Sequence, residues 1–396
     1  MLAIGTARGK TSGKIAWRGE RGAAGSLDNQ PPRLRPKIVE AAQGRRSRLL
    51  APQQTALRSQ RPKHSAEIVK EDPVPRLSIV IPCVGGAAEF DGTLVSVLQH
   101  RPADCQVLVV HTEPYDDPYR LTGEVDFLAH SGSSLTALIN AALKEVRGEI
   151  VHVVGCGLAA TEGWTDAALA HFAEADVASV SPLVLGGDGS NIVSAGVRLT
   201  SGGRRAIARD RRLLSAGAGR LRAAVQGPTL AAGFYRRDTL AAVDGFDESV
   251  GDTMADIDAA LTMRTLGHLH VCEPASRLLQ TTDDLDSGAI SGLSAGRAAE
   301  RIFWRHCVGQ GLALPLALHA LVVACSLIAA GLRFGAFAEL LGRLAACAEF
   351  GAAGRYRQRL LAARQRLDEL ATLRTTIRMP VKSAPSEAAV PRRRAA

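Results

Sequence analysis

The sequence predicts an α/β fold built on a doubly wound sheet. Between residues 77 and 154, short apolar runs of strand length alternate with amphipathic helical stretches. Continuous apolar runs are typical of strands buried on both faces, and their alternation with helices is typical of parallel sheets. Hydrophobic residues make up 46% of the chain and charged residues 22%, a composition that can bury a core and excludes wholesale disorder.

The first elements follow one another closely. The apolar run Leu77–Pro82, closed by proline, predicts a buried strand. A helix is expected next, with Leu94 and Leu98 on one face. Two further strands are expected over Gln106–Val110 and Val125–Leu128.

The clearest helical pattern lies over Leu135–Val146, where apolar residues recur at helical spacing. Ser133 or Ser134 can cap its start, and Gly148 can end it. The run Glu149–Val154 then predicts another buried strand.

The second half of the body is less regular. Its expected elements are two strands, three helices and an arginine-rich loop. In chain order they are a helix over 166–172, a strand over 177–180, the loop over 198–222, a helix near Asp238, a helix over 256–266 and a strand over 269–272.

Charge divides the chain into an acidic body and two basic tails. Residues 1–76 carry a net charge of +10, residues 77–354 carry −9, and residues 355–396 carry +8. The first segment lacks apolar periodicity and is expected to be a disordered tail that is either solvated or attracted to anionic lipid or nucleic acid. Aromatic residues are only 4%, which leaves few stacking surfaces for bases or sugars, and nucleic acid is not the expected partner of the body.

Seven dispersed cysteines without a Cys-x-x-Cys pair predict neither a disulfide framework nor a zinc site. No secretory h-region is visible in the first thirty residues, so we expect a cytoplasmic body. The uncharged run Leu312–Leu332 is long enough to cross a bilayer, and the amphipathic run Phe334–Gly354 follows it. We expect attachment to the cytoplasmic face of the membrane through 312–332, by spanning or lying on it. A core helix packed on the body is the alternative.

Several segments together resemble family-2 glycosyltransferases of the GT-A fold. They are Leu77–Pro82, the helix with Asn140, Glu149–Val154, the segment Val243–Glu248 with its Gly-Phe-Asp-Glu motif, and Ala255–Asp258. The resemblance covers about residues 77–280. The expected organisation is a basic tail over 1–76, a GT-A-like domain with a mixed sheet over 77–305, membrane-associated helices over 306–354 and a basic tail over 355–396.

The resemblance implies a nucleotide-sugar donor site at the carboxyl ends of the strands and a lipid-linked or polysaccharide acceptor. The substrate-binding residues that it implies are Pro82, His111, Asn140, Asp247, Glu248 and Arg264. His111 stands where the family holds the nucleobase with an acidic residue. Gly155-Cys156-Gly157 stands where the family places a metal-binding Asp-x-Asp, so no divalent metal or other cofactor is expected.

The remaining candidates are charged residues. Arg204 and Arg205 belong to the arginine-rich loop, which either grips the donor diphosphate in place of a metal or is merely solvated. Asp256 is the candidate general base for an acceptor hydroxyl, and Asp258 is the second catalytic candidate. Alternatively, Thr253 and Asp256 form a helix capping box.

Three functions follow. The leading one is a glycosyltransferase. A catalytically inactive glycosyltransferase-like module that binds or scaffolds at the membrane is the alternative. The third is an adaptor that binds a membrane surface or nucleic acid mainly through its basic tails.

Overall fold

The computed structural model describes residues 76–84, 87–115, 117–200, 203–209, 225–282, 291–306, 313–329 and 334–378. The expected tail over 1–76 lies outside these residues except for Arg76, and so does the chain after residue 378.

The body is a mixed sheet with the strand order β3-β2-β1-β4-β10-β6-β11-β5, to which β7 is added beside β6. The strands are β1 (Leu77–Cys83), β2 (Cys105–His111), β3 (Asp126–Ala129), β4 (Ile150–Val154), β5 (Leu158–Ala160), β6 (Val177–Leu185), β7 (Ile192–Ser194), β10 (Ala232–Arg236) and β11 (Leu269–Gln280). The first four strands are parallel, whereas β10 runs antiparallel to both β4 and β6. The sheet is therefore mixed, which fits the GT-A-like expectation.

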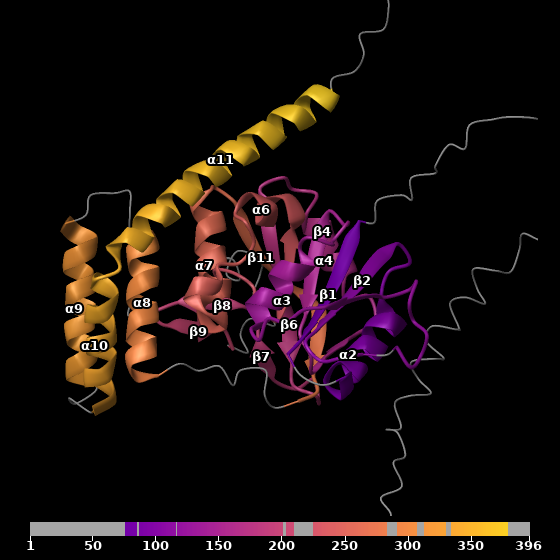
Figure 1. Cartoon of the computed structure of the whole chain (residues 1–396), viewed down its shortest axis with the longest axis horizontal. Coiled ribbons are helices and arrows are strands. Elements are labelled where there is room, and N and C mark those ends of the chain that lie inside the picture. The colour runs from indigo at the N-terminus through magenta and orange to yellow at the C-terminus, as the bar shows by residue number, and fades with distance from the viewer. Residues whose placement is uncertain are drawn as a thin grey trace, which may run out of the picture.

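Helices cover both faces of this sheet (Figure 1). The helices of the body are α2 (Ala87–His100), α3 (Leu135–Ala142), α4 (Asp166–His171), α6 (Arg237–Ala242) and α7 (Asp252–Thr265), with the short 3-10 turn η2 (Glu248–Val250) before α7. Alternation along β1 sends Ile79 and Ile81 into a core with α2 and α4, and Val80 into a core with α3. Ser134 caps α3 as expected, because its side chain accepts a hydrogen bond from the Ala137 amide.

The described part of the arginine-rich segment is a small hairpin rather than a simple loop. It consists of β8 (Val197–Leu199) and β9 (Arg205–Ile207), which pair antiparallel. Residues 210–224 of the expected loop lie outside the described residues.

Four helices follow the sheet: α8 (Gly292–His306), α9 (Ala313–Ala329), α10 (Phe334–Cys347) and α11 (Phe350–Arg378). Figure 1 shows α8, α9 and α10 standing side by side at one end of the molecule, with α11 crossing over the body. The expected basic tail after residue 355 thus begins as a long helix. Of the helices that the structure describes, none has the length and apolarity needed to cross a membrane.

His152 in the middle of β4 is a fully buried imidazole. Its ring stacks on Phe234, and its Nδ1 lies 2.9 Å from the Gly233 carbonyl oxygen, so Nδ1 carries the proton and donates. Burial lowers the pKa of His152 to about 3, against an ordinary value near 6.5. The protonated form is therefore populated mainly in the unfolded chain.

We expect the free energy of unfolding to fall as the pH drops from 6.5 towards 3. In this range the imidazole of His152 is protonated in the unfolded chain but stays neutral in the folded chain, because its folded pKa is about 3. The contribution of His152 is about 1.4 kcal/mol per pH unit in that window. Urea denaturation at several pH values measures it. The variant His152→Phe should show a shallower dependence, and an unchanged slope would contradict this assignment.

Candidate functional site

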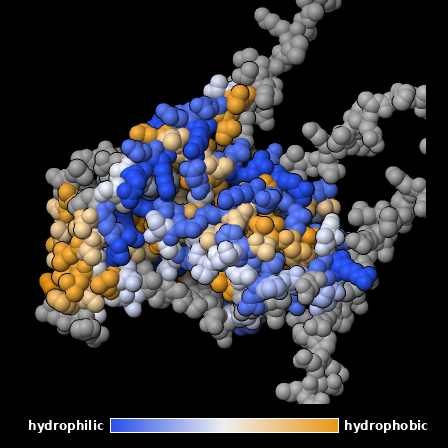
Figure 2. Space-filling model, viewed as in Figure 1, coloured by the Kyte–Doolittle hydropathy of each residue, from blue (hydrophilic) through white to orange (hydrophobic). Residues whose placement is uncertain are grey.

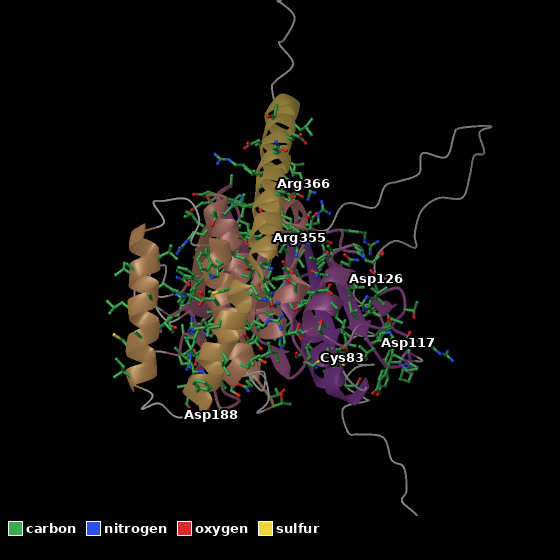
Figure 3. The ribbon with its side chains drawn as sticks, turned by 60° about the vertical axis from the view of Figure 1, so that its left-hand side comes forward. Cys83, Asp117, Asp126, Asp188, Arg355 and Arg366 are labelled. Atoms are coloured by element: carbon green, nitrogen blue, oxygen red, sulfur yellow. The ribbon has the colours of Figure 1, made fainter. Side chains whose placement is uncertain are left out.

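The strand order changes direction at β1. From β1 the chain proceeds to β2 and β3 on one side, then returns to β4 on the other side. Open α/β sheets bind their ligands at such a switch point, outside the carboxyl ends of the strands. Cys83 ends β1 there, as labelled in Figure 3, and the turn Gly155–Gly157 follows β4.

The turn Gly155–Gly157 is packed tightly against other backbone segments. The Gly155 amide donates to the Ala231 carbonyl at 2.8 Å, and the Gly157 carbonyl accepts from the Thr281 amide at 2.8 Å. Gly157 has a φ of +82°, and a Cβ there would come within 2.1 Å of Thr282 Oγ1. A carboxylate-bearing residue is disfavoured at this position by both backbone conformation and space.

The turn carries no carboxylate, the charged ligand with which proteins usually hold a hard divalent cation. The Cys156 thiol instead donates to the Pro82 carbonyl at 3.3 Å. Within the described ranges, no group of three or more His, Cys, Asp and Glu side chains could hold a metal ion.

Asp256 is linked to this turn through Leu230 and Ala231. Its carboxylate accepts from the Leu230 amide at 3.2 Å, one residue before Ala231, which contacts Gly155. Asp256 also accepts from Arg205 Nε at 2.9 Å and Arg205 Nη2 at 2.8 Å, so β9 and α7 meet here through a bidentate ion pair. The structure therefore brings two predicted residues, Arg205 and Asp256, together beside the switch point.

The pair is unequally accessible. The Asp256 side chain is 0% exposed and that of Arg205 is 16% exposed, so of the two only the Arg205 side chain reaches solvent. Burial raises the pKa of the Asp256 carboxyl above its ordinary value, and the charge of Arg205 offsets part of this rise. The expected capping box with Thr253 does not describe this carboxylate: Gly251 is the N-cap residue of α7, and Asp256 lies beyond the first turn.

Asp258 has different partners, as the i, i+2 spacing on a helix predicts. Arg305 Nη1 donates to it at 3.0 Å, and His306 Nε2 lies 3.0 Å from its other oxygen. Arg305 also contacts Asp247 at 2.9 Å. Two predicted site residues, Asp247 and Asp258, thus hold α8 against the body.

Asn140 and Glu248 form a second structural contact. The Asn140 amide nitrogen donates to the Phe246 carbonyl at 2.8 Å and to Glu248 Oε1 at 3.0 Å, and Asn140 Oδ1 accepts from the Phe246 amide at 2.9 Å. This clamp fixes the Gly-Phe-Asp-Glu segment on α3. These contacts do not place Asn140 or Glu248 at the carboxyl end of β4.

Two predicted arginines lie apart from the switch point. Arg204 pairs with Glu339 on α10, and its side chain is largely exposed. Arg264 is an exposed residue in the last turn of α7.

His111 and Pro82 are closer to the switch point but are buried. His111 Nδ1 lies 2.6 Å from the Glu113 carbonyl oxygen, to which it donates. Tyr115 packs beside it, in edge contact with Phe90 and against the ring of Phe127. These rings form an aromatic wall at the end of β2 that the sequence analysis did not single out.

A second set of residues was not singled out as a candidate site. Arg297, Arg301 and Arg305 follow one another at intervals of four residues along α8 and face Glu349 and Asp258. The i, i+4 spacing was a visible signal that one helix face is basic.

Comparisons with known proteins give the following. No family model matches the chain, and no curated protein does. Among solved structures, the chain is similar to GalNAc-T7 with UDP, GalNAc and Mn2+, at 10% identity and a TM-score of 0.47 over 59% of this chain. It spans about half of that protein, 48%. It is also similar to the mannosyltransferase PcManGT from Pyrobaculum calidifontis in complex with GDP-Man and Mn2+, at 17% identity and a TM-score of 0.43, over 83% of this chain and 94% of that one.

Proposed function

We propose that the chain is a glycosyltransferase-like protein that takes a sugar from a nucleotide-sugar donor, without a divalent metal, and passes it to a lipid-linked or polysaccharide acceptor. The observation that carries this proposal is the Arg205–Asp256 pair, which adjoins the Gly155–Gly157 turn at the switch point through Leu230 and Ala231. Donor binding requires a cation at the carboxyl ends of the strands, and sugar transfer requires a carboxylate close to it.

Arg205 supplies the positive charge that a leaving nucleoside diphosphate needs. A guanidinium binds phosphate oxygens bidentately, in the same geometry that it uses here on Asp256. A diphosphate is therefore able to compete with Asp256 for Arg205.

This competition would prepare the general base. When Arg205 turns to the diphosphate, only the hydrogen bonds from the Leu230 and Ile257 amides still offset the burial of Asp256, so the pKa of its carboxyl rises further. A base whose pKa lies nearer to neutral accepts a proton more effectively. The acceptor hydroxyl oxygen then bonds to the anomeric carbon, the bond from that carbon to the diphosphate oxygen breaks, and the hydroxyl proton passes to Asp256.

One observation favours the second candidate, an inactive binding module. The Asp256 carboxylate is fully buried and already accepts hydrogen bonds from Arg205, Leu230 and Ile257. If a bound donor leaves the Arg205–Asp256 pair intact, the carboxylate stays paired with the guanidinium and no transfer follows.

Calorimetric titration with several nucleotide sugars tests donor binding. We expect Arg205→Lys to weaken binding by about tenfold, because the ammonium keeps the charge on Asp256 but loses the bidentate fork. Arg204→Lys is the matched control: its guanidinium contacts Glu339 on α10, so it should change the affinity little. Equal effects of the two variants, or no binding of any donor, would refute the donor site.

A nucleoside diphosphate release assay separates the two candidates. Asp256→Asn should lower turnover by about 10²-fold or more, the range of general-base contributions. Donor affinity should not fall, because the carboxylate that competes with the diphosphate for Arg205 has lost its charge. EDTA should leave binding and turnover unchanged. Donor binding without release in the unmodified chain would identify the binding module, and loss of turnover with EDTA would disprove the metal-free mechanism.

We further propose that α9 and α10 lie on the cytoplasmic face of a membrane. Exposed apolar side chains gather on these helices: Leu318, Leu321, Ile328, Phe337, Leu341 and Leu344. Figure 2 shows the apolar surface over this end of the molecule. Amphipathic helices bury such faces at the lipid interface. Co-flotation of the full chain with lipid vesicles should be lost in the double variant Leu321→Glu/Phe337→Glu. It should be kept in the control Ala317→Glu, which introduces one carboxylate without removing a large apolar group. Unchanged flotation of the double variant would contradict the proposal.

A further inference from the structure

We propose a second oxyanion site, separate from the switch point, in a cavity between α8 and the junction of α10 with α11. The cavity has a volume of about 510 Å3. Its charged lining residues are Arg297, Arg301, Arg305, Arg355 and Glu349. The ligand class that these residues fit is a phosphate ester or diphosphate, from a soluble compound or from a lipid headgroup.

The lining carries more positive than negative charge. Arg297 Nε and Arg301 Nε both donate to Glu349, at 2.7 and 2.6 Å. One carboxylate thus serves two guanidiniums. Arg305 is matched by Asp247 and Asp258, whereas Arg355 has no ion pair among the described residues.

The arginines come from opposite walls. Arg297 and Arg301 are one helical turn apart on α8, and Arg355 lies near the start of α11, where Figure 3 labels it. A guanidinium offers parallel N–H donors that match two phosphate oxygens, so facing arginines can hold the oxygens of one phosphate from two sides. The Ser249 hydroxyl also lines the cavity, where it accepts a hydrogen bond from Arg305 Nη2 at 3.0 Å and can donate its own proton to the anion.

The rest of the lining is small or apolar. It consists of Trp304, Ala346, Ala348 and Gly351. Water is displaced more readily from such a wall, and charge-assisted hydrogen bonds are stronger where the local dielectric is low. An organic group attached to the phosphate would contact this wall.

This site does not depend on the proposed donor site. Asp256 and Arg205 connect β9, α7 and the segment before β10, and neither lines the cavity. Failure of donor binding at the switch point would leave the cavity unaffected, and the reverse also holds.

The full chain is titrated with inorganic pyrophosphate by calorimetry, and separately with phosphatidylcholine vesicles with and without phosphatidic acid. Arg355→Ala should weaken binding of the favoured probe by about tenfold, the loss of one charge-assisted contact. Arg364→Ala removes another exposed arginine of α11 that lies outside the cavity, and it should leave the affinity unchanged.

Pyrophosphate binding that depends on Arg355 identifies a soluble phosphate compound. Binding confined to phosphatidic acid vesicles, with the same dependence, identifies a lipid headgroup. Absence of binding to both probes, or equal losses in Arg355→Ala and Arg364→Ala, overturns the proposal, because equal losses indicate general attraction to a basic surface. Arg355 makes no ion pair in the described structure, so its removal is expected to leave the fold intact, which far-UV circular dichroism checks.

Discussion

Arg305→Met is expected to lower the free energy of unfolding by about 3–5 kcal/mol. Arg305 is a largely buried arginine that contacts Asp258 at 3.0 Å and Asp247 at 2.9 Å. Methionine fills much of the space but, among the described residues, leaves Asp258 with only His306 and Asp247 with only the exposed Arg359 as ion-pair partners. Although burial opposes it, the hydrogen bonds from Ser249 and the charge of Arg305 lower the pKa of Asp247, so losing Arg305 also raises that pKa. Urea denaturation at neutral pH measures the change.

Arg359→Met is the matched control for this experiment. Arg359 contacts the same carboxylate, Asp247, at 3.1 Å, but its side chain is 59% exposed, against 8% for Arg305. Surface ion pairs contribute about 0–1 kcal/mol, so this variant should be nearly neutral. Similar losses of unfolding free energy in both variants would show that the buried ion pair between Arg305 and Asp258 contributes no more to stability than the surface pair does.

The strands were predictable where both of their faces are buried. Residues of β1 and β4 are buried along their whole length, so the apolar runs in the sequence are continuous and mark the strands directly. The strand β10 was missed, and it contains the small residues Ala232 and Gly233 and ends at Arg236. Its antiparallel direction depends on pairing with β4 and β6, which no local pattern records.

The site was predictable only in part, because ion pairs between distant segments leave no periodic signal. Asp256 and Arg205 were each singled out, but their pairing joins residues 51 positions apart. The same holds for Arg305 and Asp258, 47 positions apart. The resemblance suggested the Gly-Phe-Asp-Glu segment as a substrate contact, and the structure uses Asp247 and Glu248 to hold α8 and α3.

The packing of α8 on α10 leads to the second large effect, which we expect for Gly342→Ala. A Cβ at Gly342 would come within 2.0 Å of the Leu293 carbonyl oxygen, and one at Gly296 within 1.9 Å of the Glu339 carbonyl oxygen. Backbone atoms cannot rotate away, so the two helices must separate. Overpacking of this kind costs about 1–3 kcal/mol, and sometimes more, even though alanine favours the helix itself by about 1 kcal/mol.

The opposite sign is expected for Gly354→Ala on α11, where a Cβ meets no atom within 4 Å. Only the helix preference acts there, so the variant should be more stable by about 0.5–1 kcal/mol. Chemical denaturation of both variants measures the two signs. Separation of α8 from α10 would also widen the cavity that Arg297 and Ala346 line, so Gly342→Ala should weaken pyrophosphate binding while Gly354→Ala does not. A stabilising effect of Gly342→Ala would show that the close contact of these two helices is not present in solution.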